Sequence, residues 1–287
     1  KKHGPYSPNY QYYCADGEMA MRSYYGGCGF KSCVAIKVLV LPAEKRAIMM
    51  SADVQRYNED CRHYREKAKF YPDWEVIVFH DNSLASDVVE KLGLGATLRN
   101  VSDCGIFPAS WRFLAYDEDN VERFISRDAD SRLSQREADA VAEWEDSGKD
   151  LHIMRDHPHH GSPAHGKPVL GGMWGMIKRP LQQFDGNVKT MRDLCLQHQG
   201  GKKHTTNRDE WFWTDMNFLR DAIYRVLGTP EDCKIHAARD YMHKVAWKNE
   251  PWATGFPTPR NADKNFVGEV IEIIDGKEQR AYQYTEL

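Results

Sequence analysis

The chain has 287 residues, of which 41% are hydrophobic and 28% are charged, and its formal net charge is −3 with histidine neutral. A chain of this length buries about three quarters of the surface that its unfolded form exposes, which predicts one large folded domain. Lysine and arginine are dispersed rather than gathered in a basic stripe, and no run of about eighteen apolar residues occurs, so both a nucleic-acid partner and a membrane span are disfavoured.

The first third of the chain predicts alternating strands and helices. Residues 1–31 are rich in tyrosine and glycine without a sustained period, so we expect an irregular arm packed across the domain. The β-branched apolar run at 34–41 is typical of a strand covered on both faces, and a helical pattern follows over 51–71. A second buried strand at 74–81 precedes a short helix that ends at Gly93. This rhythm predicts an α/β fold with a mostly parallel open sheet flanked by helices.

Asp81 is the first candidate site residue. In open parallel sheets ligands bind beyond the carboxyl ends of the strands, so Asp81 stands where a base or a ribose would be met. The alternative is that Asp81 and its polar neighbours only cap the next helix. A short strand at 96–101 follows, and Pro108 opens a helix that carries Arg112.

Two acids follow the strand predicted at 121–126. In an extended segment Asp128 and Asp130 project to the same side, and paired carboxylates suit a hard divalent cation. The flanking Arg127 and Arg132 fit a phosphorylated substrate, since a guanidinium group pairs bidentately with phosphate oxygens. The alternative is an ordinary solvated turn.

The second half continues with clear local signals. Ser134 and Glu137 form a capping box for a helix that Gly148 ends, and a strand at 151–154 leads into a loop with four histidines: His157, His159, His160 and His165. Those histidines leave a zinc site open as an alternative. Helices are predicted near 188–198 and from Thr214 or Asp215 to Gly228, then a strand at 233–236. Asp275-Gly276 is the turn signal of a C-terminal hairpin.

Three blocks of sequence carry a family resemblance. In order and spacing, the blocks at 127–137, 153–158 and 170–175 resemble a group of bacterial and viral glycosyltransferase-like proteins with the GT-A fold. Looser matches extend the resemblance over roughly 50–270; they lie at 71–74, 214–219 and 266–269. Related proteins typically have Asp-Gln where this chain has Asp215-Met216.

The resemblance implies a nucleotide-sugar-dependent glycosyltransferase that acts on a hydroxyl of a glycan or glycoconjugate acceptor. It implies one GT-A domain at 32–287, with a nucleotide half at about 32–132 and an acceptor half at about 133–287. A Mn²⁺ or Mg²⁺ ion would be held by Asp128, Asp130 and His236, since imidazole with two carboxylates suits Mn²⁺.

The same resemblance implies roles for further side chains. Arg112, with Asp81, Arg127 and Arg132, would contact the nucleotide sugar; for Arg112 a surface ion pair is the alternative. Asp215 would be the general base of an inverting reaction, or only a helix cap. The sugar or acceptor would be lined by Asp156, His157, Gly172 and Trp174.

In this lining Gly172 would permit close backbone approach, and Trp174 would offer an apolar face to a sugar, with core packing as its alternative. Two other functions compete: a zinc hydrolase built on the histidine loop, and a carbohydrate-binding protein without catalysis. The clustered Cys14, Cys28 and Cys33 and a sequon at Asn100 favour the secretory pathway with a removed anchor, while reduced thiols in the cytoplasm stay an alternative.

Overall fold

The computed structural model describes residues 34–37, 46–52, 69–82, 86–128, 131–157, 160, 166–200, 213–238, 250–261, 265–269, 271–274 and 277–280. The arm expected at 1–31 and most of the helix expected at 51–71 lie outside these ranges. Within them, no helix has both the length and the apolar character needed to cross a membrane.

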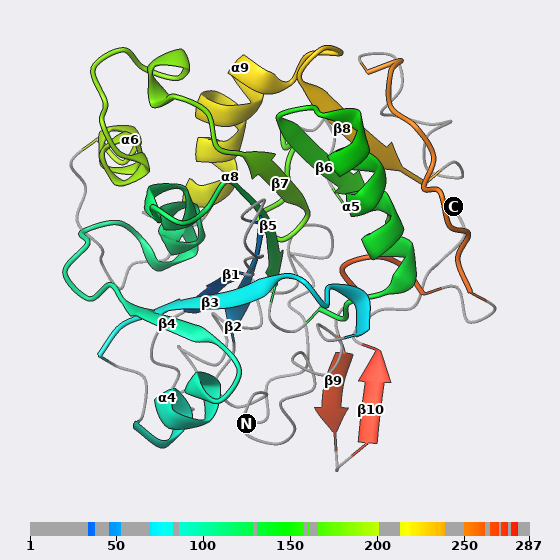
Figure 1. Ribbon diagram of the computed structural model, residues 1–287, viewed down its shortest axis with the longest axis horizontal. Helices are drawn as coiled ribbons and strands as arrows, with labels where there is room; N and C mark the ends of the chain where they lie inside the picture. The colour runs from blue at the N-terminus through cyan, green and yellow to red at the C-terminus, as the bar shows by residue number, and fades with distance from the viewer. Residues whose placement is uncertain are drawn as a thin grey trace, which may run out of the picture.

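An eight-stranded mixed sheet is the centre of the molecule (Figure 1). Its order is β4-β3-β1-β2-β5-β7-β6-β8. The bounds in chain order are β1 Val34–Lys37, β2 Arg46–Ala52, β3 Glu75–His80, β4 Thr97–Asn100, β5 Arg123–Asp128, β6 Leu151–Arg155, β7 Trp174–Ile177 and β8 Cys233–Ala237. The pairings make six of the eight strands run in one direction, and only β1 and β7 run against them.

The chain reverses its direction of travel across the sheet between β2 and β5. It proceeds from β2 to β3 and then β4 on one side, and returns to place β5 on the other side of β2. The parallel register sets Ser51 of β2 opposite Asp128 of β5, at the carboxyl end of both strands. A crevice outside the carboxyl ends at such a switch point is where open α/β sheets bind their ligands.

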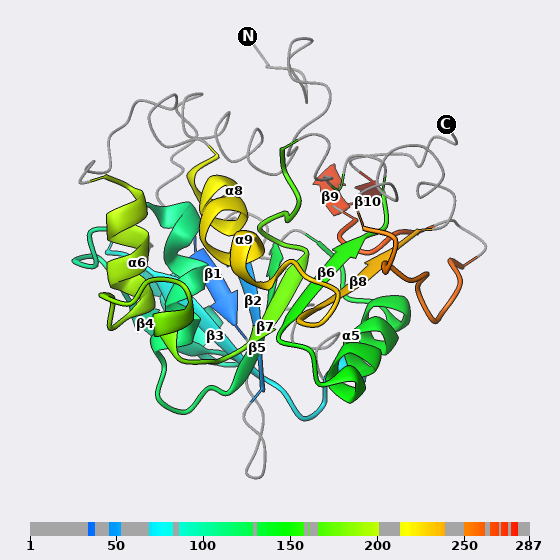
Figure 2. The ribbon, with the colours of Figure 1, turned by 90° about the horizontal axis from the view of Figure 1, so that it is seen from above.

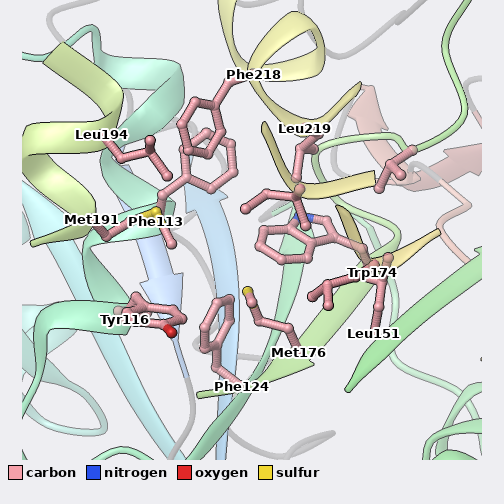
Figure 3. Close-up of a cluster of buried hydrophobic side chains, with 14 of the residues drawn as sticks. Phe113, Tyr116, Phe124, Leu151, Trp174, Met176, Met191, Leu194, Phe218 and Leu219 are labelled. Carbon is pink, nitrogen blue, oxygen red and sulfur yellow. The ribbon is translucent and has the colours of Figure 1, made fainter. Parts of the chain in front are cut away.

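Alternating side chains of the central strands fill two separate cores. Ile77, Phe79 and Phe124 face one side, where they pack with the 3₁₀ helix η2 (Pro108–Asp117), α6 (Met191–His198) and the helical run α8–η5–α9 (Thr214–Phe218, Leu219–Tyr224, Arg225–Leu227). Val76, Val78 and Ile125 face the other side, against α4 (Ser86–Gly93) and α5 (Gln135–Ser147). Figure 2 shows α8 and α5 on opposite sides of the sheet, and Figure 3 shows the first core.

Helix ends follow the local sequence. Pro108 is the first residue of η2, Ser134 Oγ accepts from the Glu137 N–H at the start of α5, and Gly148 ends that helix at φ 65°. The Glu137 side chain departs from the capping box, since it turns into the core toward Arg127 and Tyr71. A short 3₁₀ turn η4 (Leu181–Gln183) precedes α6.

A mixed α/β fold is confirmed, as is a C-terminal hairpin, formed by β9 (Ile271–Ile274) and β10 (Lys277–Arg280). The expected mostly parallel pairing is found only in part, since four strand pairings of the main sheet are parallel and four are antiparallel. The strand expected at 34–41 is found at Val34–Lys37, but it is antiparallel to both neighbours. The helix start expected at Ser51 was wrong, because Ser51 lies in β2, and the strand β7 at residues 174–177 was not expected.

Candidate functional site

Asp128 ends β5 at the switch point, and its carboxylate is held by an arginine from η2. Arg112 Nη1 lies 3.0 Å from Asp128 Oδ1. The arginine side chain is 6% exposed and that of Asp128 is 21% exposed, so this pair is neither a surface contact nor a fully enclosed one. Ser131 closes the turn after the strand, because both its N–H and its hydroxyl donate to the Asp128 carbonyl.

The glycine pair before β7 approaches this carboxylate because of strand register. In the antiparallel pairing of β5 with β7, Ser126 lies opposite Trp174. Asp128, two residues after Ser126, therefore lies opposite Gly172, two residues before Trp174. A β-carbon on Gly172 would stand 2.5 Å from Asp128 Cγ and 3.0 Å from its backbone nitrogen. Side chains larger than hydrogen therefore do not fit beside Asp128.

Gly171 plays the same part for Asp215. A β-carbon there would lie 2.8 Å from Asp215 Oδ2 and 2.9 Å from Arg112 Nη1. The Ser126 hydroxyl donates to the Gly171 carbonyl, which fixes the glycine pair to β5. One short backbone segment thus brings Arg112, Asp128 and Asp215 to the same place.

Asp215 lies in the first turn of α8, and the pKa of its carboxyl is raised. Burial raises the pKa of Asp215, and the nearby Asp128 charge raises it further. The positive charges of Arg112 and Lys167 and the Met216 N–H lower it. The net pKa of the Asp215 carboxyl is above its ordinary value.

The helix that carries Asp215 begins in an unusual way. Trp213, not Thr214 or Asp215, is its N-cap, with no side-chain cap bond and a left-handed backbone at φ 69°. The capping role expected for Thr214 or Asp215 was therefore wrong. Lys167 Nζ lies 4.9 Å from the Trp213 ring centroid and donates to Asn217 Oδ1 at 3.0 Å.

Arg127 does not face this cluster. Its side chain is fully buried and forms an ion pair with Glu137 of α5. Its Nη1 also donates to the Ser126 and Trp174 carbonyls, while the Tyr71 hydroxyl donates to Glu137. Side chains alternate along a strand, so Arg127 points away from Asp128, and the nucleotide contact expected for it is replaced by a core ion pair.

His236 was expected to bind the metal with Asp128, and the sheet order separates them. Strands β7 and β6 lie between β5 and β8, so three strand spacings, roughly 14 Å, separate the two. His236 is fully buried, with Nδ1 2.8 Å from His152 Nε2 and Nε2 3.2 Å from Glu143 Oε2. Burial lowers its pKa to about 4. Its role is structural, between β6 and α5.

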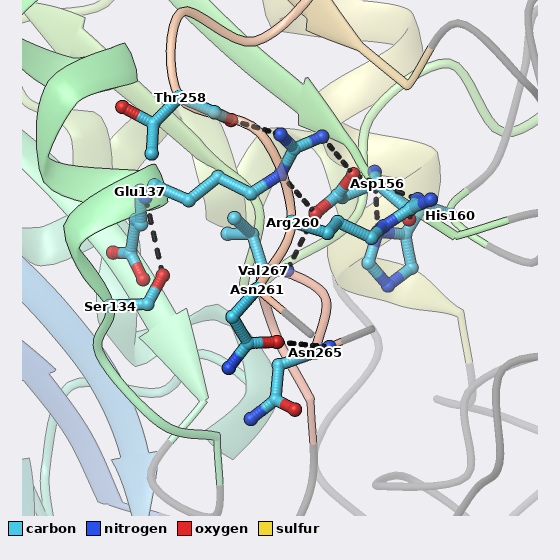
Figure 4. Close-up of polar contacts among 10 residues, drawn as sticks. Ser134, Glu137, Asp156, His160, Thr258, Arg260, Asn261, Asn265 and Val267 are labelled. Atoms are coloured by element: carbon cyan, nitrogen blue, oxygen red, sulfur yellow. Dashed lines mark hydrogen bonds and ion pairs between the residues drawn. The ribbon is translucent and has the colours of Figure 1, made fainter. Parts of the chain in front are cut away.

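Asp156 was expected to bind sugar hydroxyls, but its carboxylate is occupied by protein donors (Figure 4). Arg136 donates to both oxygens at 2.8 and 2.7 Å, Arg260 donates to Oδ1 at 3.0 Å, and the Val267 N–H donates to Oδ2 at 2.9 Å. The side chain is fully buried. It joins α5 to the C-terminal segment.

His157 and Trp174 also belong to the packed interior. His157 is 5% exposed and lies 4.6 Å from the Phe266 ring, centroid to centroid. Trp174 is fully buried against Phe113 and Phe124, and its Nε1 donates to the Gly171 carbonyl (Figure 3). The core alternative for Trp174 is therefore the correct one, because β7 turns this side chain into the sheet's inner face.

The remaining predicted residues are only partly located. Asp81 follows β3 at the same carboxyl edge as Asp128, and it is half-buried. Arg132 is half-buried, and its N–H donates to the Glu269 carbonyl at 3.1 Å. Asp130 lies outside the described residues, as do Cys14, Cys28 and Cys33. Cys104, Cys195 and Cys233 are free thiols.

The residues fit a divalent cation in part. In the described ranges no group of three or more His, Cys, Asp or Glu side chains is arranged to hold a metal ion. Asp128 nevertheless offers a hard carboxylate at a partly open position. Of the four histidines in the loop, His157 and His160 pack against Phe266, and His159 and His165 lie outside the described residues.

The comparisons with known proteins returned no match: no family model, no curated protein and no solved structure is similar enough to report. The site is therefore defined by its own geometry. Lys167 and Trp213 are members of it that sequence reasoning missed. The position of Trp213 two residues before Asp215 is the one signal in the sequence that pointed to it.

Proposed function

We propose that the chain is a metal-dependent glycosyltransferase that moves a sugar from a nucleotide-sugar donor to a hydroxyl of a glycan or glycoconjugate acceptor. The observation that carries the proposal is the convergence of Asp128, Arg112 and Asp215 on Gly171-Gly172 at the switch point of the sheet. Asp128 can bind a metal ion, Arg112 can bind phosphate, and Asp215 can take up a proton. All three lie at the edge where open α/β sheets bind nucleotides.

Contacts between distant sequence blocks support the proposal. Arg132 of the first block bonds to Glu269 near the C-terminus, and Val267 bonds to Asp156 of the second block. Gly172 of the third block lies against Asp128. The blocks on which the resemblance to GT-A glycosyltransferases rests are therefore in contact with one another near the carboxyl ends of β5 and β6.

Each side chain has a distinct task in this proposal. A Mn²⁺ or Mg²⁺ ion, held by Asp128 and Asp130, would neutralise the donor diphosphate when bound. Arg112 keeps the Asp128 carboxylate in position and adds positive charge beside the phosphates. Asp215 takes the proton from the attacking acceptor hydroxyl as the glycosidic bond to the nucleoside diphosphate breaks.

The test is a thermal-shift panel of UDP-, GDP-, CMP- and dTDP-sugars with and without Mn²⁺. We expect one nucleotide class to raise the Tm of the wild type only with Mn²⁺, because a ligand that binds the folded state stabilises it. Asp128→Asn should abolish that shift. Asp146→Asn, which changes an exposed acid on α5, is the matched control and should retain it. A panel without any Mn²⁺-dependent shift in the wild type would contradict the proposal.

A further inference from the structure

Trp213 differs from the other tryptophans in the described part of the chain. Trp74, Trp111, Trp144 and Trp174 are each at most 5% exposed, whereas Trp213 is half-buried. Trp252, also half-buried, packs against the hydrophobic core. Trp213 instead lies two residues from Asp215, with the Lys167 ammonium over its ring.

Trp213 has a strained backbone conformation that glycine would adopt easily and tryptophan does not. It is the one non-glycine residue with positive φ in the described ranges, at 69°. A bulky residue is disfavoured in this left-handed region, where glycine is not, because its β-carbon crowds the backbone. The Asn217 N–H donates to the Trp213 carbonyl at 2.8 Å, and Lys167 contacts both the Trp213 ring and the Asn217 side chain.

A strained residue held beside a reactive group suggests function. An aromatic face flanked by an ammonium and an amide is the chemistry that recognises a sugar, since the ring packs on the apolar face of a pyranose while donors and acceptors meet its hydroxyls. Lys167, which lies over the Trp213 ring, is also close enough to act electrostatically on Asp215, so a hydroxyl of a sugar seated there lies near the proposed base. The irregular π-helical segment η5 follows directly after α8, as is frequent at functional sites.

We propose that Trp213, with Lys167 and Asn217, forms the acceptor subsite, and that the acceptor is a glycan whose terminal pyranose packs against the Trp213 indole. That the bound sugar is an acceptor rests on the proposed function; that a pyranose binds here does not. The subsite is distinct from Trp174, which lies in the core.

The test measures binding of p-nitrophenyl glycosides of glucose, galactose, mannose, N-acetylglucosamine and xylose by saturation-transfer NMR. Trp213→Gly removes the ring and suits the observed φ, so we expect it to fold with a Tm at or near that of the wild type. It should weaken binding of the recognised glycoside by about tenfold or more. Trp213→Phe, which keeps an aromatic face, should bind within about threefold, and the control Trp252→Phe should bind as the wild type does.

Two results would overturn the subsite: no glycoside bound by the wild type, or equal binding by Trp213→Gly. The two proposals fail separately. If glycoside binding depends on Trp213 but no nucleotide sugar shifts the Tm, the proposed glycosyltransferase function is wrong and the proposal of a sugar subsite is supported. If the Mn²⁺-dependent donor shift appears but Trp213→Gly binds glycosides normally, only the subsite is wrong.

Discussion

Gly172 lies so close to Asp128 that a β-carbon on the glycine would stand 2.5 Å from the aspartate Cγ. The approach follows from the antiparallel register of β5 and β7, which sets the two residues opposite each other just beyond the ladder. The absence of a side chain at this position is therefore a condition for the Asp128 carboxylate to hold its place beside Arg112.

Gly172→Ala should displace Asp128 and remove the Mn²⁺-dependent donor shift, with a loss of stability of about 1 to 3 kcal/mol from overpacking. Urea unfolding and the thermal-shift assay measure the two effects. Gly186→Ala is the control, because Gly186 has no positive φ and a β-carbon there would meet nothing within 4 Å. A Gly172→Ala variant with a normal donor response would show that the close approach has no functional role.

Arg112 is expected to set the pH range of the reaction. It lowers the pKa of the Asp215 carboxyl, so Arg112→Met should raise that pKa. A general base acts only when deprotonated, so the acid limb of the pH dependence of kcat should move to higher pH. Donor affinity should also fall by roughly 1 to 3 kcal/mol. Arg220→Met, which changes an arginine paired with Asp221, should move neither quantity; an unmoved acid limb in Arg112→Met would separate Arg112 from Asp215.

The Arg127–Glu137 pair should behave as part of the core. Glu137→Ala leaves a fully buried guanidinium without its carboxylate, which should cost about 3 to 5 kcal/mol in urea unfolding. The double variant Arg127→Met, Glu137→Met should recover most of that loss, since it removes both charges. Its donor affinity should equal that of the wild type. A selective loss of donor affinity with stability intact would return Arg127 to a nucleotide-binding role.

Local signals along the chain predicted much of the fold, and register decided the rest. Pro108, Ser134 and Gly148 marked helix ends correctly because capping depends on neighbouring residues alone. Strand β7 was missed because its Trp-Gly-Met-Ile sequence has no strong β signal, and without β7 the position of Trp174 in the core could not be seen.

The candidate site was predicted in part for the same reason. Asp128, Arg112 and Gly172 were identified, but their mutual contacts depend on non-local pairing. His236 was assigned to the metal because the resemblance implies a metal-binding histidine at the end of this strand. Only the sheet order shows how far β8 lies from β5. Asp156 was assigned to sugar binding because it lies in the second block of the resemblance. Its structural role was not predicted, because its partners Arg260 and Val267 are more than a hundred residues away.

His236 should make the protein less stable in mild acid. Burial lowers its pKa to about 4, with Glu143 opposing and Lys234 and Arg136 reinforcing the shift, and the pKa of its partner His152 is also lowered. The unfolded chain takes up a proton near pH 6.5 and the folded chain does not until about 4. Stability should therefore be constant above about pH 6.5 and fall by roughly 3 kcal/mol as the pH drops toward 4.

Urea unfolding of wild type and His236→Asn at pH 8 and pH 5 measures this effect. The asparagine variant is expected to be less stable at pH 8 but to lose less stability on acidification, since the side chain at position 236 then has no titratable group. Equal pH dependence in the two proteins would mean that His236 does not carry the effect.

In the proposed mechanism Asp128 acts on the donor and Asp215 acts on the acceptor. The direct measurement is calorimetric titration of Asp128→Asn and Asp215→Asn with Mn²⁺ and the nucleoside diphosphate selected by the thermal-shift panel, beside their transfer rates. We predict that Asp215→Asn binds as the wild type does while transfer falls by about 10² to 10⁴, and that Asp128→Asn loses binding itself. Wild-type binding by Asp128→Asn, or near-normal transfer by Asp215→Asn, would contradict the account.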